Sequence, residues 1–204
     1  MNKYFAPIHI DFFKSEKDYL TNLLFCIDTN RDFVILLFLI SQFYYRNRYN
    51  GNYSNKITID KSFNSESCFL KKLKISKKEI INRIVNLEEN YFIKNILDHR
   101  ESIEIIFNTA PLDISDKSKR FSICLDELHS FKYLEHSIIF LLTRFGNDTG
   151  YLYHNRICKI LKINKLSLPR QKNKIKRIFS SLVKSGHLKS FEYIKGSFKY
   201  TYHR

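Results

Sequence analysis

One order of secondary-structure elements occurs twice along this sequence, and this repetition limits the fold more than any other feature. Hydrophobic periodicity and turn residues predict helix, strand, helix, helix, strand and strand within residues 31–107. The same order is predicted again within residues 133–203. Similar residues precede the last helix of each copy, Lys72–Ile75 in the first and Ile160–Ile163 in the second. The sequence therefore predicts two copies of one small unit.

Local signals set the limits of these elements. Ser76 and Glu79 have the spacing of a capping box, and Ser167 is expected to cap the corresponding helix of the second copy. His154 and Asn155 are expected to cap the helix before it. The expected ranges are 31–45, 56–60, 65–73, 76–89, 91–97 and 102–107 in the first copy, and 133–145, 151–153, 156–161, 169–184, 188–194 and 198–203 in the second.

The expected fold class follows from this order. A strand at 121–125 and a linker near 109–120 are expected between the copies. Three helices followed by a hairpin are typical of DNA-binding helix-turn-helix units that carry a wing. We therefore expect an α+β fold, mainly α, made of two tandem winged helix-turn-helix domains, residues 1–111 and residues 112–204.

Charge is distributed unevenly between the two copies. Residues 1–111 carry 16 Lys and Arg against 13 Asp and Glu, whereas residues 112–204 carry 19 against 7. Within residues 156–204, a single acid, Glu192, accompanies 14 basic residues. A compact segment with one sign of charge repels itself unless a polyanion lies nearby. This distribution favours a nucleic-acid partner for the second copy, and a solvated basic face is the alternative.

The helix expected from Pro169 to Lys184 combines an apolar stripe with a polar face that contains no acid. The stripe comprises Ile175, Ile178, Phe179, Leu182 and Val183. The opposite face comprises Arg170, Asn173, Lys174, Arg177, Ser180, Ser181 and Lys184. In a DNA major groove, Arg pairs with guanine and Asn with adenine, while Lys and Ser hold phosphates. We expect a recognition helix here, against the alternative of a merely solvated face.

Ten residues are the candidates for contact with DNA. They belong to this helix, to the segment before it and to the C-terminal hairpin. They are Arg156, Lys165, Arg170, Asn173, Lys174, Arg177, Ser181, Lys184, Lys195 and Lys199. In the hairpin, Phe198, Tyr200 and Tyr202 alternate with polar residues, so this side is expected to pack inward. For each hairpin lysine alone, a solvent-exposed position on a structural sheet is the favoured explanation.

The first copy has a different charge pattern. Its last helix offers basic and amide side chains, but acids accompany them. The acids are Glu79, Glu88 and Glu89 in the helix, and Asp98, Glu101 and Glu104 in the hairpin. Because carboxylates repel phosphate, we expect this copy to add little to DNA affinity. Self-association or contact with another protein is one hypothesis for its role, and a purely structural role is the other.

Signals for catalysis, metals and membranes are weak. The sequence contains no GxxxxGK[ST], HExxH or GxSxG motif, so we expect no enzyme activity and no small-molecule cofactor. The four cysteines are far apart, with no CxxC pair, so we expect no metal site. The most apolar run, Phe33–Ile40, is too short to cross a bilayer, and the N-terminus has no secretory pattern. We therefore expect a cytoplasmic protein with reduced thiols.

The second half of the chain resembles a known family of DNA-binding proteins. The residues that carry the resemblance are Leu141–Leu142, the helix Ile157–Ile163, and Lys172–Lys184 leading into the hairpin around Gly196. Together they resemble plasmid replication initiators of the iteron-binding type, which have two winged helices. The resemblance implies that the second copy contacts repeated DNA sites and that the first forms a homodimer. It also implies host replication proteins as partners. Two alternative functions are a winged-helix transcriptional regulator and a protein adaptor without DNA binding.

Overall fold

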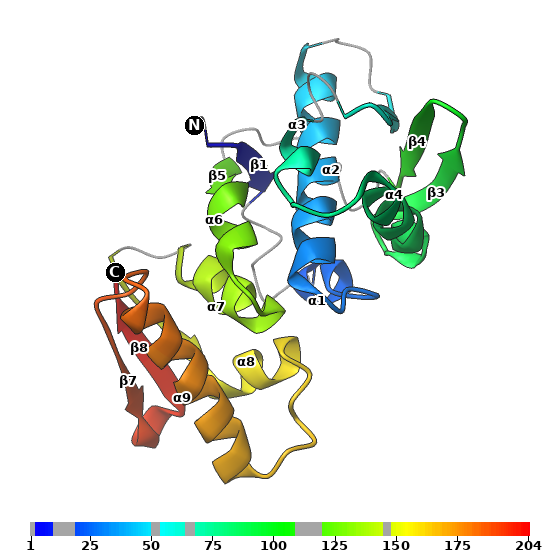
Figure 1. Cartoon of the computed structure of the whole chain (residues 1–204). Coiled ribbons are helices and arrows are strands. Elements are labelled where there is room, and N and C mark those ends of the chain that lie inside the picture. The colour runs from blue at the N-terminus through cyan, green and yellow to red at the C-terminus, as the bar shows by residue number, and fades with distance from the viewer. Residues whose placement is uncertain (1–2, 10–18, 50–53, 64–67, 109–119, 145–147) are drawn as a thin grey trace.

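The computed structural model has an α+β fold, and it describes residues 3–9, 19–49, 54–63, 68–108, 120–144 and 148–204. The elements of the first copy, repeat 1, are α2 (Asn30–Tyr49), β2 (Lys56–Asp60), α3 (Cys68–Lys71), α4 (Lys77–Val85), β3 (Ile93–Asp98) and β4 (Ser102–Phe107). Those of the second copy, repeat 2, are α7 (Leu134–Arg144), β6 (Thr149–Tyr153), α8 (His154–Ile160), α9 (Leu168–Lys184), β7 (Ser190–Ile194) and β8 (Lys199–His203). The repeated order of elements is therefore confirmed (Figure 1).

The two repeats also share their sheet topology. Each has a three-stranded antiparallel sheet in which the last strand lies in the middle, with the orders β2-β4-β3 and β6-β8-β7. The turns before α4 and α9 have a common feature as well. Lys74 and Lys162, which match in the sequence comparison, both have left-handed backbone conformations, with φ of 54° and 55°. A lysine rarely adopts a positive φ, so the shared value indicates the same turn geometry in both repeats.

The expected helix caps are confirmed in part. The Ser76 hydroxyl accepts a hydrogen bond from the Glu79 backbone N–H (3.1 Å), which is one half of the predicted capping box. The reciprocal half is not formed, because the Glu79 carboxylate contacts Arg83 instead. Ser167 has the N-cap backbone conformation, but its side chain makes no capping hydrogen bond. Pro169 accounts for part of this difference, because a proline at the second helical position offers no N–H to the cap. The cap expected at His154 and Asn155 is wrong: Tyr153 is the N-cap, and His154 is a buried first helical residue.

Elements outside the two repeats connect them. Strand β1 (Phe5–His9) pairs antiparallel with β5 (Arg120–Cys124), and α6 (Leu125–Ser130) follows at once. Helix α6 packs on α2, and a short helix α1 (Tyr19–Leu23) contacts α8. A 3-10 turn, η4 (Asn86–Glu89), extends α4. The proposed domain boundary at residues 111 and 112 lies outside the described residues, as does most of the expected linker.

A buried polar cluster joins α2, α6 and α7. The Asn30 side-chain amide donates to the carbonyls of Leu128 (2.8 Å) and Phe131 (2.7 Å). The Ser137 hydroxyl donates to the Asn30 carbonyl oxygen (2.6 Å). The Asn30 amide and the Ser137 hydroxyl thus each have hydrogen-bond partners, which offsets the cost of burying them away from water. The first helices of the two repeats, α2 and α7, are thereby held in fixed contact.

Candidate nucleic-acid interface

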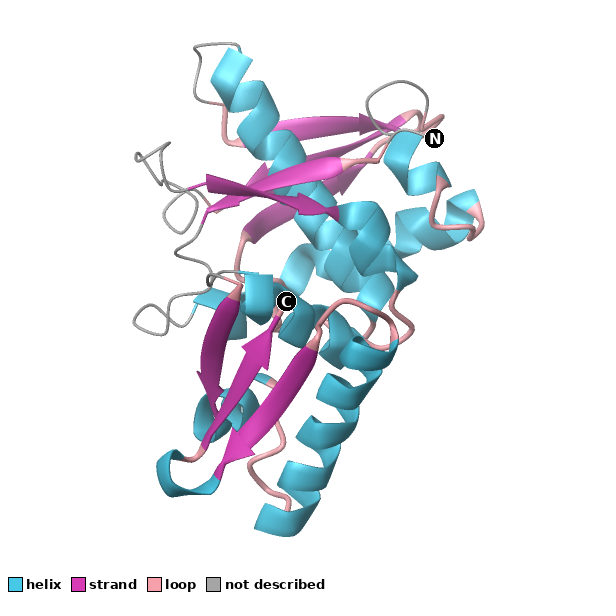
Figure 2. Ribbon diagram, turned by 90° about the vertical axis from the view of Figure 1, so that its left-hand side faces the viewer, coloured by secondary structure: helices cyan, strands magenta, loops and turns pink. Residues whose placement is uncertain are grey.

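Helix α9 is fixed by apolar residues along one side. Its buried residues are Ile175, Ile178, Phe179 and Leu182. Phe179 stacks on Phe191 of β7 (5.2 Å between ring centroids) and on Tyr200 of β8 (5.3 Å). Burying side chains of this size stabilises a fold by ~1.5–3 kcal/mol each. The predicted stripe therefore holds α9 against the sheet and α7. In Figure 2, α9 is the long helix beside the lower sheet.

The outward face of α9 is polar, basic and exposed. Beyond Leu168 and Pro169 at its start, the exposed residues of α9 are Arg170, Asn173, Lys176, Arg177, Ser180, Ser181 and Lys184. No acid occurs within α9. In the described part of the chain, neither Arg170 nor Arg177 forms an ion pair with a carboxylate. All of these residues except Arg170 line one shallow hollow of about 580 Å³. Lys176 was missed as a candidate, because helical spacing places it at the edge of the face.

Lys174 differs from the other candidates of this helix. Its ammonium lies 3.0 Å from the Glu135 carboxylate of α7, and both side chains are partly exposed. Partial burial alone would raise the pKa of Glu135, but hydrogen bonding at its helix start and the Lys174 charge outweigh burial, so the pKa is lowered. Lys174 is therefore partly neutralised within the protein. Its role as a DNA contact stays a prediction.

A half-buried glutamine, Gln171, holds the turn before α9 in place. The Gln171 amide N–H groups donate to the backbone carbonyls of Leu166 (2.8 Å) and Asn164 (3.2 Å). Its carbonyl oxygen lies 2.9 Å from Nε2 of the buried His154, which donates to it. Sequence reasoning missed Gln171 as a positioning residue. The signal was its place on the apolar side of the helix, four residues before Ile175.

The hairpin β7–β8 lies beside the first turns of α9. The Lys172 ammonium is 4.9 Å from the centroid of the Tyr193 ring and 5.7 Å from that of Phe198. Lys195, at the hairpin tip, is exposed. Tyr200 and Tyr202 are buried as expected, whereas Phe198 is 48% exposed and has a left-handed backbone. The inward packing expected of Phe198 is therefore wrong, because the strand begins only after it.

The remaining candidates lie around this face. Lys165 is exposed in the turn between α8 and α9. Arg156 of α8 is only partly exposed. Lys199 lies 4.8 Å from the ring centroid of Tyr151, on the side of the sheet away from the buried Tyr200. Exposed lysines thus lie in the turn before α9 and at the hairpin tip near the first turns of this helix, whereas Lys199 lies on a different face of the sheet.

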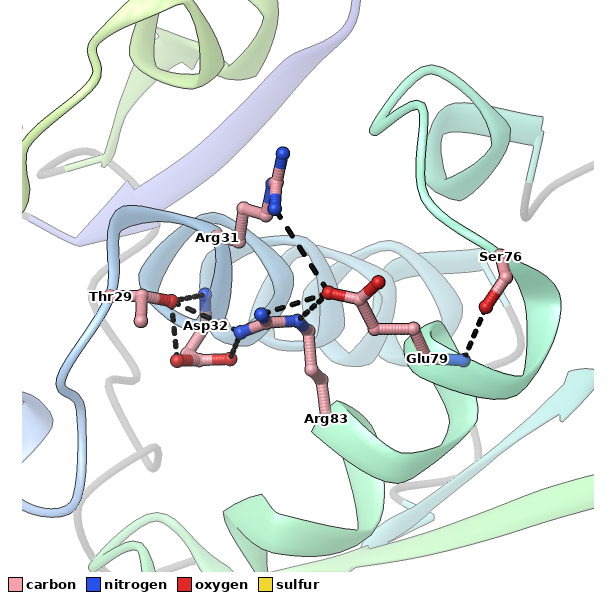
Figure 3. A network of polar contacts seen from close by, with 6 residues as sticks. All are labelled: Thr29, Arg31, Asp32, Ser76, Glu79 and Arg83. Carbon is pink, nitrogen blue, oxygen red and sulfur yellow. Dashed lines mark hydrogen bonds and ion pairs between the residues drawn. The ribbon is translucent and has the colours of Figure 1, made fainter.

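The last helix of repeat 1 presents a closed polar network instead of a free basic face. Figure 3 shows the Arg83 guanidinium between two carboxylates. It lies 2.7 Å from Asp32 of α2 and 2.9 Å from Glu79 of α4, and it donates to the Thr29 hydroxyl (3.2 Å). Arg31 approaches Glu79 at 4.0 Å. The acids of the hairpin also form ion pairs. Asp98 of β3 lies 2.6 Å from Lys61, and Glu104 of β4 lies 3.0 Å from Lys56 of β2.

Other kinds of site find little support among the described residues. Within those residues, no group of three or more His, Cys, Asp or Glu side chains is arranged to hold a metal ion. The described helices include none with the length and apolar composition needed to cross a bilayer. Burial raises the pKa of the Cys158 thiol, which lies in the core behind α9. No known protein-family model matches this chain, and no curated protein matches it.

Proposed function

We propose that this protein binds double-stranded DNA sequence-specifically through repeat 2. In this proposal each repeat is a winged helix-turn-helix, α9 enters the major groove, and the β7–β8 hairpin is the wing. The order of three helices and a hairpin supports the fold assignment. The observation that carries the function is the exposed, acid-free face of α9, whose arginines are not paired with carboxylates in the described part of the chain.

We further propose that the DNA sites are repeated sequences at an origin of replication. The resemblance of repeat 2 to iteron-binding initiators suggests this role. Repeat 1, whose last helix is closed by ion pairs, then serves for dimerisation or for contact with host replication proteins. Such a division of tasks agrees with the unequal charge of the two halves of the sequence.

Footprinting across the DNA that flanks the coding region of this protein tests the proposal. Protection of several direct repeats is the expected result. Protection of one palindromic site would favour a transcriptional regulator, which the same surface would serve. Absence of any salt-sensitive binding to duplex DNA would contradict DNA binding itself and would favour a protein adaptor.

The salt dependence of binding gives a quantitative form of the same test. Six exposed cations surround the proposed interface, namely Lys165, Arg170, Lys176, Arg177, Lys184 and Lys195. If most of them neutralise phosphates, the logarithm of the binding constant falls with the logarithm of salt concentration with a slope of about −4 to −5. A slope near zero would contradict the proposed interface.

A further inference from the structure

Both repeats have a groove in the same place, between the start of their first helix and their last helix. The groove in repeat 1, groove 1, has a volume of about 330 Å³, and that in repeat 2, groove 2, about 640 Å³. When the N-cap residues Ser76 and Ser167 are aligned, the residues that line the two grooves correspond one to one along the last helices. Those of α4 are Glu79, Asn82, Arg83, Asn86 and Leu87. Those of α9 are Arg170, Asn173, Lys174, Arg177 and Ile178.

One ion pair is common to both grooves. In groove 1, Arg83 lies 2.7 Å from Asp32, in the first turn of α2. In groove 2, Lys174 lies 3.0 Å from Glu135, in the first turn of α7. A pair that recurs at matched positions belongs to the packing of the repeat, where it ties the first helix to the last. We therefore assign the Lys174–Glu135 pair a structural role.

At two matched positions, groove 2 has an arginine where groove 1 has an acidic or a neutral residue. Glu79 of groove 1 corresponds to Arg170, and Asn86 corresponds to Arg177. Asp28 and Asp32 also line groove 1, so it holds three acids and one Arg, whereas groove 2 holds one acid, three Lys or Arg residues and His136. In groove 1 the Glu79 carboxylate binds Arg83 and fills the site of an anion. In groove 2 the position of Glu79 is taken by Arg170, and within the described residues neither Arg170 nor Arg177 forms an ion pair with a carboxylate.

We propose that groove 2 holds a backbone phosphate of the DNA, gripped by Arg170 and Arg177, and that groove 1 excludes phosphate. This inference rests on the proposed DNA binding of repeat 2. Guanidinium groups bind phosphate oxygens through paired, charge-assisted hydrogen bonds. Tyr133, at the wall of groove 2, offers a further hydroxyl donor. Arg177 then holds a phosphate rather than a guanine, and one DNA strand passes between the start of α7 and α9.

The test compares two double variants on a labelled duplex of random sequence. Such a duplex reports phosphate contacts, because contacts with particular bases contribute nothing to binding it. The groove variant is R170Q/R177Q, and the control is K94Q/K189Q, which removes the same charge from exposed lysines outside the groove. Thermal unfolding of both variants, expected at the wild-type temperature, establishes that each is folded.

The groove variant is expected to bind about 30-fold more weakly at 0.15 M salt, with a salt slope shallower by about two units, while the control keeps the wild-type slope. Equal slopes for the groove variant and the control would overturn the phosphate site and leave DNA binding by α9 intact. A wild-type protein that binds the duplex without salt dependence would overturn the proposed function as well. The two failures are therefore distinguishable.

Discussion

The two repeats of this protein share one topology and differ in the length, the anchoring and the ion pairs of their last helix. Helix α4 is short, ends in a 3-10 turn and has its arginine closed between carboxylates. Helix α9 has 17 residues, is anchored by an aromatic stack and turns a basic face outward, whose Arg170 and Arg177 have no ion-pair partner among the described residues. The difference teaches that the shared elements specify the fold, while a few exposed positions specify the charge that a repeat presents on its surface.

The aromatic anchor of α9 offers the largest test of this comparison. Phe179 corresponds to Glu88 of repeat 1, so this position stacks the last helix on the sheet in repeat 2 but not in repeat 1. Phe179→Ala is expected to lower the free energy of unfolding by about 3–5 kcal/mol, because a buried ring leaves a cavity. Denaturant unfolding measures this loss. The control Phe25→Ala, at a side chain 57% exposed, should cost less than about 1 kcal/mol. Similar losses in both variants would contradict the anchor.

The matched ion pairs should contribute unequally to stability. Arg83 is flanked by two carboxylates, and its pair with Asp32 is only 22% and 17% exposed. Arg83→Ala is expected to cost about 1–2 kcal/mol, because it leaves partly buried charges unpaired. The Lys174 pair is 41% and 33% exposed, so Lys174→Ala should cost at most about 0.5–1 kcal/mol. Chemical denaturation of the two variants gives the comparison, and a larger loss for Lys174→Ala would show that we have misjudged the pairs.

Much of this comparison is accessible from the sequence, because it depends on local patterns. The capping residue Ser76, the matched Lys74 and Lys162, and the apolar stripe of α9 all act within one or two turns of chain. These patterns predicted the order of elements and the outward face of α9.

The features that sequence reasoning missed depend on contacts between distant residues. Strand β1 pairs with β5 across more than a hundred residues, and neither strand carries a signal for its partner. Helical spacing places Lys174 on the basic face, but only the folded structure shows Glu135 beside it. Groove 2 likewise exists only where α7 and α9 meet. Local periodicity describes each side of such a contact but not the contact.

Removal of the acid from groove 2 should strengthen DNA binding. Glu135→Gln frees the Lys174 ammonium and removes a carboxylate that repels phosphate. Affinity for duplex DNA is expected to rise about fivefold at 0.15 M salt, with the slope steeper by about one unit. The matched variant Asp32→Asn, in groove 1, should leave affinity unchanged if repeat 2 carries the proposed DNA binding. Fluorescence anisotropy titrations measure both. An equal gain in both variants would point to net charge alone as the cause.

The smallest expected effect is a dependence of the free energy of unfolding on pH. The folded protein lowers the pKa of Glu135 below its ordinary value: burial raises this pKa, but backbone hydrogen bonding and Lys174 outweigh burial. A depressed carboxyl pKa contributes stability above the unfolded value, and this contribution is lost as the pH falls through the folded value. The wild type should therefore be more stable than Glu135→Gln near neutral pH.

That advantage of the wild type should shrink once the pH falls below about 4.3, the ordinary pKa of a glutamate. Denaturant unfolding of the two proteins between neutral pH and about pH 3 measures the difference. A difference that stays constant over this range would mean that the Glu135 charge is not what ties α7 to α9. In that case the recurring ion pair would be only a geometric coincidence, and the correspondence of the two grooves would rest on their shape alone.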